Sequence, residues 1–336
     1  MLRVLLCCVY AKLIPVASRR LTMNIQILTV CFNAILPTFL MMAVGFLSRQ
    51  LRLLDGDDVS TMNGLAFKLF LPIMLFHNIY SSDLTASVNP KLLLYAVLAV
   101  LASFGLSIAY TLLAVKDRSK RSVYIQGIYR SNFVVIGLPL ASALIEDAEV
   151  SSVALLTAVV VPLFNVLAVI CLEAFSGRRV KPLTLLLDVT RNPLILAAAL
   201  GVLCSAWHIT LPTALESALA DLSKIGSPLA IFLLGAFFRF DSIRRHARDL
   251  VRICTMRLVV MPAIFLGLAF ALGFRGVEFA GLIGIFASAT AVSSFTMAQH
   301  MGGDSELAGD IVISTSILCS ISLYLWSILF KSLHVI

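Results

Sequence analysis

The residues best suited to bind a solute lie within the sequence RSNFVVIGLPLASAL, which begins at Arg130 in an otherwise apolar region. Arg130 offers a cation, Ser131 a hydroxyl and Asn132 an amide. Gly137 and Pro139 then interrupt any helix, because proline removes a backbone donor and clashes with the preceding turn. The freed backbone groups need partners, which a water-lined site or a polar solute can supply. A simple kink packed against neighbouring helices explains the break alone equally well.

A second polar stretch is FASATAVSSFTMAQHMGGD. Between Ala287 and Ser294 every residue except Val292 is alanine, serine or threonine. Ser288, Thr290, Ser293 and Ser294 offer four hydroxyls. This composition lowers helix propensity and favours an interruption, although small residues also let helices pack closely in lipid. The hydroxyls together with the amide of the first stretch are suited to recognition of a polar solute without a cofactor.

The charged residues within apolar segments are mostly cationic and favour an anionic substrate. Lys68, Arg130 and Lys224 lie deep in such segments, where ionisable groups are costly and often functional. Asp221 lies three residues before Lys224, so an ion pair on one helix face, with snorkelling of the long side chains, is the alternative role for the lysines. Arg257 lies nearer the end of its segment and is expected to snorkel. The scarcity of carboxylates disfavours a metal-ion or drug-cation pathway.

Catalytic and metal-binding signatures are not recognised in the sequence. It lacks the H-E-x-x-H, G-x-S-x-G and P-loop motifs. The five histidines and seven cysteines show no ligand spacing, so we predict no cofactor, no metal and no catalytic residue. Asp55, Asp57 and Asp58 are best explained by a turn and a cap for the next helix, and Asp304 by a helix cap.

The composition is that of a polytopic membrane protein. Of the 336 residues, 60% are hydrophobic and 13% charged, against about 45–50% and about 25% in soluble domains. Ten apolar runs have spanning length, at about 26–47, 59–80, 91–115, 122–145, 150–174, 192–208, 213–238, 250–272, 277–299 and 307–330.

Basic residues mark alternate loops and predict the orientation of the chain. The arginines and lysines concentrate in the loops that follow spans one, three, five and seven. Positive residues stay on the cytoplasmic side, so both termini are predicted to lie on the non-cytoplasmic side of the membrane. The net charge of +8 is thereby assigned to loops and not to nucleic-acid binding. Residues 1–22 do not fit this pattern, because they place four basic residues on the side that should have few. A poor signal sequence and a start codon assigned too early, with Met23 as the true start, explain this segment equally well.

An internal repeat at an offset of 156 residues divides the chain. Four of the matching pairs are Pro37 and Pro193, Gly45 and Gly201, Lys68 and Lys224, and Pro72 and Pro228. The predicted parts are an N-terminal extension (1–22), a first five-helix repeat (23–176), a cytoplasmic linker (177–191) and a second five-helix repeat (192–336). Since five is odd, the second repeat enters the membrane from the opposite side. Inverted repeats are frequent in secondary transporters, and the predicted fold is all-α with ten transmembrane helices.

Several segments in order resemble the auxin efflux carrier family in its bacterial form, whose members have been labelled malonate or malate permeases. They are LPTFLMMAVGFLSRQLRLLD, LAFKLFLPIMLF, RSNFVVIGLPLASAL, VTRNPLILAAALGVL, LSKIGSPLAIFLLGA and ASATAVSSFTMAQHMGGDSELAG. The resemblance implies broken fourth and ninth helices that cross near the midplane, with Asn132, Gly137 and Pro139 in one crossing element. Ser288 to Ser294 belong to the other, which lacks the proline that some relatives place there. The resemblance further implies a scaffold and a transport domain that move in an elevator-like alternation.

With the resemblance, the predicted function is secondary transport of small organic anions, such as mono- or dicarboxylates, across a bacterial inner membrane. Asn132 and the hydroxyls of the ninth span would bind the polar head, while Arg130, Lys68 or Lys224 would supply positive charge. A cation-coupled symporter or antiporter of the same fold is the first alternative, and a membrane sensor that binds a carboxylate without moving it is the second. An integral-membrane enzyme comes third, and a homodimer is left open.

Overall fold

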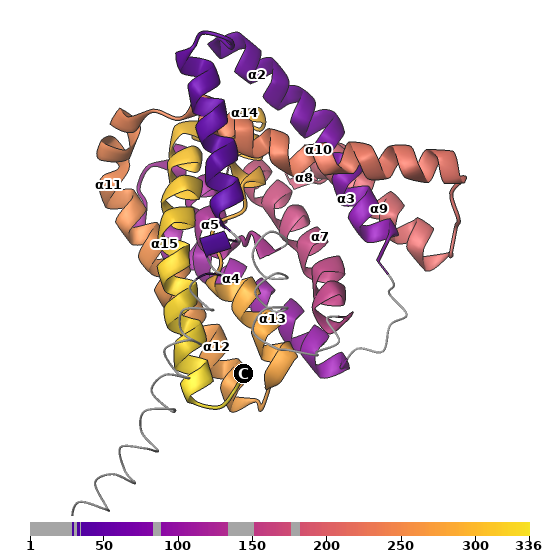
Figure 1. The fold of residues 1–336 in the computed structure, drawn as a ribbon, viewed down its shortest axis with the longest axis vertical. Coiled ribbons are helices and arrows are strands. Elements are labelled where there is room, and N and C mark those ends of the chain that lie inside the picture. Colours follow the sequence, from indigo (N-terminus) through magenta and orange to yellow (C-terminus); the bar gives the residue numbers. More distant parts are fainter. Residues whose placement is uncertain (1–28, 30–31, 34, 83–88, 134–150, 176–181) are drawn as a thin grey trace, which may run out of the picture.

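The computed structural model describes residues 29, 32, 33, 35–82, 89–133, 151–175 and 182–336, and its regular elements in these ranges are helices (Figure 1). Residues 1–22, predicted as an extension, and residues 134–150 lie outside the described residues. In chain order the helices are Ile35–Gln50, α2 (Gly56–Leu65), η1 (Ala66–Phe70), α3 (Leu71–Tyr80), α4 (Pro90–Ala114), α5 (Arg118–Tyr129), α7 (Ser151–Ala174), α8 (Pro182–Arg191), α9 (Pro193–Ala206), α10 (Thr213–Phe237), α11 (Phe240–Thr255), η2 (Met256–Val260), α12 (Met261–Ala271), α13 (Gly276–Ala287), α14 (Ser293–His300) and α15 (Ser305–Ser332).

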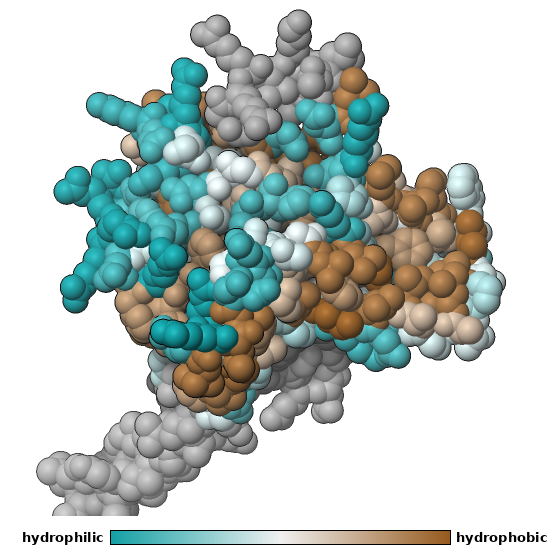
Figure 2. Space-filling model, turned by 90° about the horizontal axis from the view of Figure 1, so that it is seen from above, coloured by the Kyte–Doolittle hydropathy of each residue, from teal (hydrophilic) through white to brown (hydrophobic). Residues whose placement is uncertain are grey.

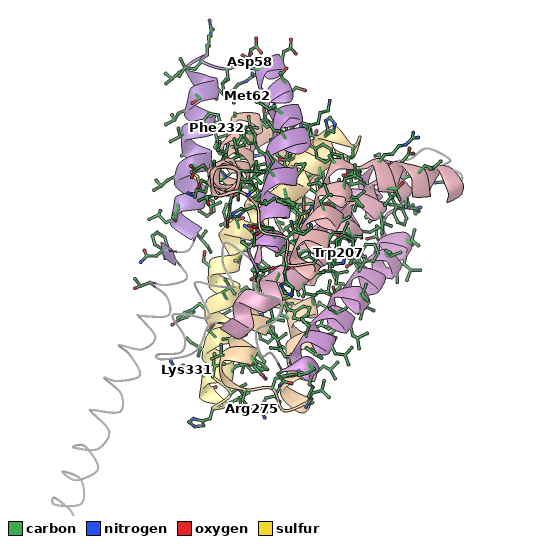
Figure 3. All side chains as sticks on the ribbon, turned by 90° about the vertical axis from the view of Figure 1, so that its right-hand side faces the viewer. Asp58, Met62, Trp207, Phe232, Arg275 and Lys331 are labelled. Atoms are coloured by element: carbon green, nitrogen blue, oxygen red, sulfur yellow. The ribbon has the colours of Figure 1, made fainter. Side chains whose placement is uncertain are left out.

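Six helical stretches of the described chain are long and apolar enough to cross a membrane. They are Gly56–Tyr80, Pro90–Ala114, Leu156–Ala174, Thr213–Phe237, Phe240–Ala271 and Ser305–Ser332, and three shorter apolar helices are Ile35–Gln50, Pro193–Ala206 and Gly276–Ala287. These nine coincide with nine of the ten predicted spans. The remaining predicted span, 122–145, is represented by α5 and continues outside the described residues. Asp58 lies at one end of the molecule, and Arg275 and Lys331 lie at the other (Figure 3).

The predicted helix caps are confirmed. The Asp55 side chain accepts hydrogen bonds from the backbone N–H groups of Asp57 and Asp58 at the start of α2. The Asp58 backbone hydrogen bond also holds the pKa of Asp55 below its ordinary value. Asp304 accepts from Leu307 N at 3.0 Å and caps α15. These carboxylates satisfy the free N–H groups of a first helical turn.

The π-helical turns η1 and η2 each precede a proline by two residues. Pro72 follows η1, and Pro262 follows η2. Proline cannot donate to the carbonyl four residues earlier, which for Pro262 is that of Leu258. Ser322 Oγ and Trp326 Nε1, both on α15, donate to this carbonyl at 2.7 and 3.0 Å. The widened turn is therefore satisfied by a neighbouring helix, as the lipid environment requires.

The arginine-rich sequence predicted as a loop before residue 250 is instead the helix α11. Its buried residues, Ser242, His246, Leu250 and Ile253, recur every three or four positions. The arginines between them are exposed, so this segment is an amphipathic extension of the span that follows. Figure 2 views the molecule from the end where Asp58 lies, and there hydrophilic side chains gather on one side, beside a hydrophobic zone. The predicted linker 177–191 likewise contains helix α8.

Two helix crossings repeat the same contact with the halves exchanged. A Cβ on Gly45 would lie 2.0 Å from the carbonyl oxygen of Phe232 on α10. A Cβ on Gly201 of α9 would lie 3.1 Å from the carbonyl oxygen of Phe76 on α3. Gly201 and Phe232 follow Gly45 and Phe76 by 156 residues each. Glycine is required at the closer crossing, because any side chain would collide with backbone.

A third contact joins one pair of matching positions to each other. Gly226 of α10 follows Phe70 of η1 by 156 residues, and a Cβ on Gly226 would lie 3.1 Å from the Phe70 carbonyl oxygen. In this contact of η1 with α10 a residue meets the position that the 156-residue offset pairs with it.

Helices α5 and α13 form the centre of the described molecule. Every residue from 122 to 129 in α5 and from 279 to 287 in α13 is buried. A helix that is enclosed on all sides must end where polar backbone groups find internal partners. Both helices end next to each other at the site described below.

Candidate functional site

Two interruptions of the central helices meet at one point. α5 ends at Tyr129, and Arg130 has an extended backbone. The predicted ninth span is interrupted between α13 and α14, where Ser288 is extended. The Asn132 N–H donates to the Ala289 carbonyl at 2.9 Å and joins the two non-helical segments. Gly137 and Pro139, predicted to break the fourth span, lie outside the described residues.

Arg257 holds the two interruptions together. Its Nε donates to Ser288 O at 2.9 Å, Nη1 to Tyr129 O at 3.3 Å and Nη2 to Ile285 O at 3.0 Å. The last carbonyls of a helix lack intrahelical partners and carry partial negative charge, so a cation is favoured there. Arg257 is only 1% exposed, and the expectation that it snorkels to the membrane surface is wrong. Capping two helix ends from inside the protein outweighs hydration of the side chain.

Three of the predicted site hydroxyls are engaged in the crossing. Ser131 Oγ and Ser288 Oγ lie 2.6 Å apart. Thr290 Oγ1 donates to Gly127 O at 2.8 Å, and its N–H donates to Thr315 Oγ1 at 3.2 Å. All three side chains are buried. Their hydrogen bonds explain why small polar residues occupy this apolar region, since the interrupted backbone needs nearby donors and acceptors.

Arg130 lies beside the crossing and is surrounded by neutral partners. Nη2 donates to Asn165 Oδ1 at 2.5 Å and to Ser293 Oγ at 2.8 Å. Nη1 donates to Gln126 Oε1 at 3.1 Å, Met297 Sδ at 3.0 Å and Ser294 Oγ at 3.4 Å. Among the described residues no carboxylate pairs with this guanidinium, and Nε has no hydrogen-bond partner.

The lack of a counter-ion among the described residues makes Arg130 unusual for a buried charge. The side chain is 1% exposed. A buried ion is normally paired, because removing the ion from water costs on the order of several kcal/mol. Hydrogen bonds to neutral groups offset only part of this cost. A positive charge held in this way attracts an anion.

A cavity of about 130 Å³ opens next to Arg130. Its wall is formed by α3, α7, α10, the residues that follow α5, and the residues from Ala291 to the start of α14. The lining residues are Leu71, Met74, Asn78, Arg130, Ser131, Asn132, Phe133, Val161, Phe164, Asn165, Ser227, Ala230, Ala291, Val292 and Ser293. Among these described residues the polar groups are amides, hydroxyls and one cation. This arrangement can hold a small anion with an apolar portion.

The two predicted lysines are not brought to the cavity. Lys68 and Lys224 are exposed and do not line it. Lys224 forms an ion pair with Asp221 at 2.8 Å, with its side chain 74% exposed. The alternative role, pairing and exposure at the outer face of a helix, therefore describes Lys224. Position along a span did not reveal which face of the helix each lysine occupies.

Asn165 and Asn78 are site residues that sequence reasoning missed. Asn165 binds Arg130 and also donates from Nδ2 to Val161 O at 3.0 Å. Asn78, which belongs to α3, also lines the cavity. An amide within an apolar span was the available signal, since buried amides need partners. Metal binding has no support here: the described residues contain no group of three or more metal-ligating side chains.

Comparison with known proteins places these features in context. A family model described as "Membrane transport protein" matches residues 30–184 and residues 178–327. An "Uncharacterized transporter" of Methanothermobacter thermautotrophicus is 22% identical over 301 residues, which cover 88% of this chain and 97% of that protein. A "Probable auxin efflux carrier component 5b" of Oryza sativa subsp. japonica is 29% identical over 140 residues, which cover 38% of this chain and 36% of that protein. These archaeal and plant relatives do not support the narrower resemblance to bacterial malonate or malate permeases.

Proposed function

Because the chain belongs to the membrane transport protein family that includes the auxin efflux carriers, we propose that it is a secondary transporter of small organic anions. Family membership makes it a multi-pass membrane transporter and not an enzyme. The substrate class is our proposal, and one observation carries it. Arg130 is a buried cation without a carboxylate partner among the described residues, and it borders a cavity whose other polar groups are neutral.

In the proposed complex the carboxylate of the substrate binds the Arg130 guanidinium. Asn165 and Ser293 accept hydrogen bonds from Nη2 and hold the guanidinium in place beside the cavity. The Asn132 side chain lines the cavity and can donate to a second carboxylate oxygen. Apolar residues such as Phe133 and Phe164 complete the cavity and contact the rest of the molecule. Hydrogen bonds to charged groups contribute about 1.5–3 kcal/mol each, enough for selective binding without a cofactor.

We further propose ten transmembrane helices arranged as two inverted five-helix repeats, with the fourth and ninth helices broken. The exchanged glycine contacts and the meeting of Phe70 with Gly226 support a two-fold relation between the halves. The hydrogen bond from Asn132 to Ala289 supports the crossing. Half-helix ends at a midplane site are typical of such transporters.

The position of the cavity supports an elevator-like mechanism. Leu71, Met74 and Ser227 contribute to one wall from α3 and α10, while Arg130 and Ser293 contribute to the other. In the proposal α3 and α10 belong to a fixed scaffold, and the crossing moves past them with the bound anion. Because the anion binds between the scaffold and the crossing, movement of the crossing exposes the binding site to one side of the membrane and then to the other.

The exposed arginines of α11 support a cytoplasmic location for that end of the molecule. Under this assignment both termini lie on the non-cytoplasmic side of the plasma membrane. Labelling of single cysteines introduced at Arg248 and Arg275 in intact cells tests the assignment. A membrane-impermeant reagent should label only the cysteine at position 275, and the reverse pattern would overturn the orientation.

A thermal-shift screen of the purified protein against small carboxylates tests the proposed substrate class. The panel includes lactate, benzoate and malonate, with matched neutral amides as controls. A specific ligand raises stability in proportion to RT ln(1 + [L]/Kd), so a carboxylate should raise the melting temperature and its amide should not. Equal shifts from both, or no shift from any carboxylate in a broad panel, would contradict an anion site. Uptake of the active carboxylate into proteoliposomes then separates a transporter from a sensor.

A further inference from the structure

A second cavity opens between α11 with its continuation η2 on one side and α15 on the other. Its volume is about 410 Å³, larger than the 130 Å³ of the cavity beside Arg130. Most of its lining is apolar, and the exposed part includes Val259, Ile321 and Leu325, each more than half exposed. The proposed anion binding does not use this recess, which we refer to as the α11–α15 groove.

The groove is a built feature of the contact between the two helices. Its inner part is formed by Cys254, Leu258, Ser322 and the Trp326 ring. Ser322 Oγ and Trp326 Nε1 donate to Leu258 O at 2.7 and 3.0 Å, and these hydrogen bonds fix the indole beside the widened turn η2. The small side chains of Cys254 and Ser322 leave the space unfilled.

The length of the groove matches an acyl chain of one bilayer leaflet. α15 runs lengthwise through the molecule, from the end where Asp58 lies to the end where Lys331 lies (Figures 1 and 3). Along α15 the groove lining extends from Leu318 to Leu329, which is about 16 Å at a rise of 1.5 Å per residue. The hydrocarbon core of a bilayer is about 30 Å thick, so one leaflet accounts for about 15 Å.

The exposed face of α11 becomes cationic beyond one end of the groove. Thr255 lines the groove, and Val251, Arg248 and Arg244 precede it at helical spacings of four, three and four residues. All four are exposed and share one face of α11, since residues three and four apart are neighbours. Helical side chains tilt toward the N-terminus of their helix, so both guanidinium groups extend away from the apolar lining.

The charges of Arg244 and Arg248 are available to a ligand. Among the residues that the structure describes, neither arginine forms an ion pair. The adjacent Arg245, by contrast, pairs with Glu306 at 2.9 Å. An apolar groove that leads to two free cations is complementary to an amphipathic anion.

The separation of the cations from the groove favours a phospholipid over a fatty acid. Arg248 lies seven residues before Thr255, about 10 Å along the helix axis. In a phospholipid the glycerol and ester groups separate the phosphate from the acyl chains. In a fatty acid the carboxylate is attached directly to its chain and would lie at the apolar edge of the groove.

The same charges disfavour a second copy of the chain as the occupant. Two copies inserted in the same direction are related by an axis along the membrane normal, and a two-fold interface places the same surface on both sides. Arg244 and Arg248 of the two copies would then meet at the same depth. Like charges that face each other across an interface are costly.

We propose that the α11–α15 groove binds one anionic phospholipid, with an acyl chain along α15 and the phosphate on Arg244 and Arg248. The inference does not depend on the substrate proposed for the Arg130 cavity. Phosphatidylglycerol carries a net negative charge, whereas phosphatidylcholine adds a compensating positive charge. Each arginine near an anionic lipid strengthens binding by about fivefold, so the two together should favour phosphatidylglycerol by roughly ten- to thirtyfold.

Tryptophan quenching by brominated lipids tests the proposal in the full chain. The protein has two tryptophans, and Trp207→Phe leaves Trp326 as the reporter in the groove. Bromine atoms on an acyl chain quench tryptophan fluorescence on contact. In phosphatidylcholine vesicles, brominated phosphatidylglycerol should reach half-quenching at roughly tenfold lower mole fraction than brominated phosphatidylcholine, and high salt should weaken this preference.

Matched variants assign the preference to the groove and its arginines. Trp326→Phe keeps Trp207, which is 69% exposed after α9, and this reporter should be quenched equally by the two lipids. Combined Arg244→Gln and Arg248→Gln in the Trp326 reporter should abolish the preference. Arg248→Gln alone, with a partial loss expected, repeats the test if the double variant fails to fold. Lys331→Gln removes a cation at the opposite end of α15 and should leave the preference unchanged.

Four results would overturn the proposal. Equal quenching of Trp326 by the two lipids would show ordinary contact with bulk lipid. Loss of the preference in Lys331→Gln instead of the arginine variants would place the headgroup at the other end of the groove. A brominated fatty acid that quenches as strongly as brominated phosphatidylglycerol would assign the groove to free fatty acids. Absence of quenching by every brominated lipid would show that protein covers the groove.

Discussion

Replacing Arg130 and Arg257 separately by methionine distinguishes a substrate-binding cation from a structural one. Both side chains are 1% exposed and both belong to the same crossing. Arg257 donates to three backbone carbonyls, whereas Arg130 donates to five neutral side-chain atoms and keeps Nε free. The two substitutions remove the same charge and similar volume, so each serves as the control for the other.

The expected magnitudes follow from what each guanidinium contacts. Removing one partner of a buried ion pair costs about 3–5 kcal/mol, and every 1.4 kcal/mol is about tenfold in affinity. Arg130→Met should therefore weaken carboxylate binding by roughly a hundredfold to a few thousandfold. In the absence of anion its stability should change by less than about 1 kcal/mol, because the lost hydrogen bonds are offset by relief of an unpaired charge. Arg257→Met leaves three buried carbonyls without donors and should lose at least about 3 kcal/mol of stability.

The assay is thermal unfolding of the purified variants with and without the panel carboxylate, followed by calorimetric titration for the dissociation constant. The predicted pattern is a low melting temperature for Arg257→Met and an absent ligand shift for Arg130→Met. Wild-type affinity in Arg130→Met would refute the assignment of the anion site. A large loss of stability in that variant without anion would show instead that Arg130 is structural.

Four further substitutions and one control variant test the packing and the division of roles. Gly45→Ala places a methyl group 2.0 Å from a backbone carbonyl of α10 and should cost about 1–3 kcal/mol or more in thermal unfolding, whereas Gly64→Ala, with nothing within 4 Å, should be tolerated. Ser293→Ala should weaken carboxylate binding about tenfold in titration by loosening the guanidinium, and Ser288→Ala should lower stability by about 1 kcal/mol with affinity retained. Lys224→Ala should leave flux within twofold of wild type, and a loss of more than tenfold would return this lysine to the site.

The crossing shows how far the sequence alone could predict the site. Arg130, Asn132 and Ser293 were selected because polar groups and weak helix formers interrupt apolar spans, and these residues do line one cavity. The sequence could not predict that Arg257 would cap the two helix ends, because that contact joins segments 128 residues apart. Apolar periodicity predicts that a residue lies in a span, and tertiary packing decides which partner it meets.

The lysines and Asn165 show the complementary limit. Depth along a span suggested Lys68 and Lys224, but the face of the helix determines exposure, and uniformly apolar neighbours give little periodic signal. Asn165 was passed over, although its span contains Pro162 three residues earlier. The repeat offset was more informative, since Gly45 and Gly201 make corresponding contacts in the structure. Matching positions carry information about packing that single residues lack.

Counterflow in proteoliposomes measures the central claim most directly. Vesicles loaded with unlabelled carboxylate and containing wild-type protein should take up the labelled carboxylate from outside, and vesicles containing Arg130→Met should take up no more than protein-free vesicles. Arg130→Met protein that is folded and still exchanges the anion at the wild-type rate would contradict the account, because the buried cation would then have no part in moving the anion.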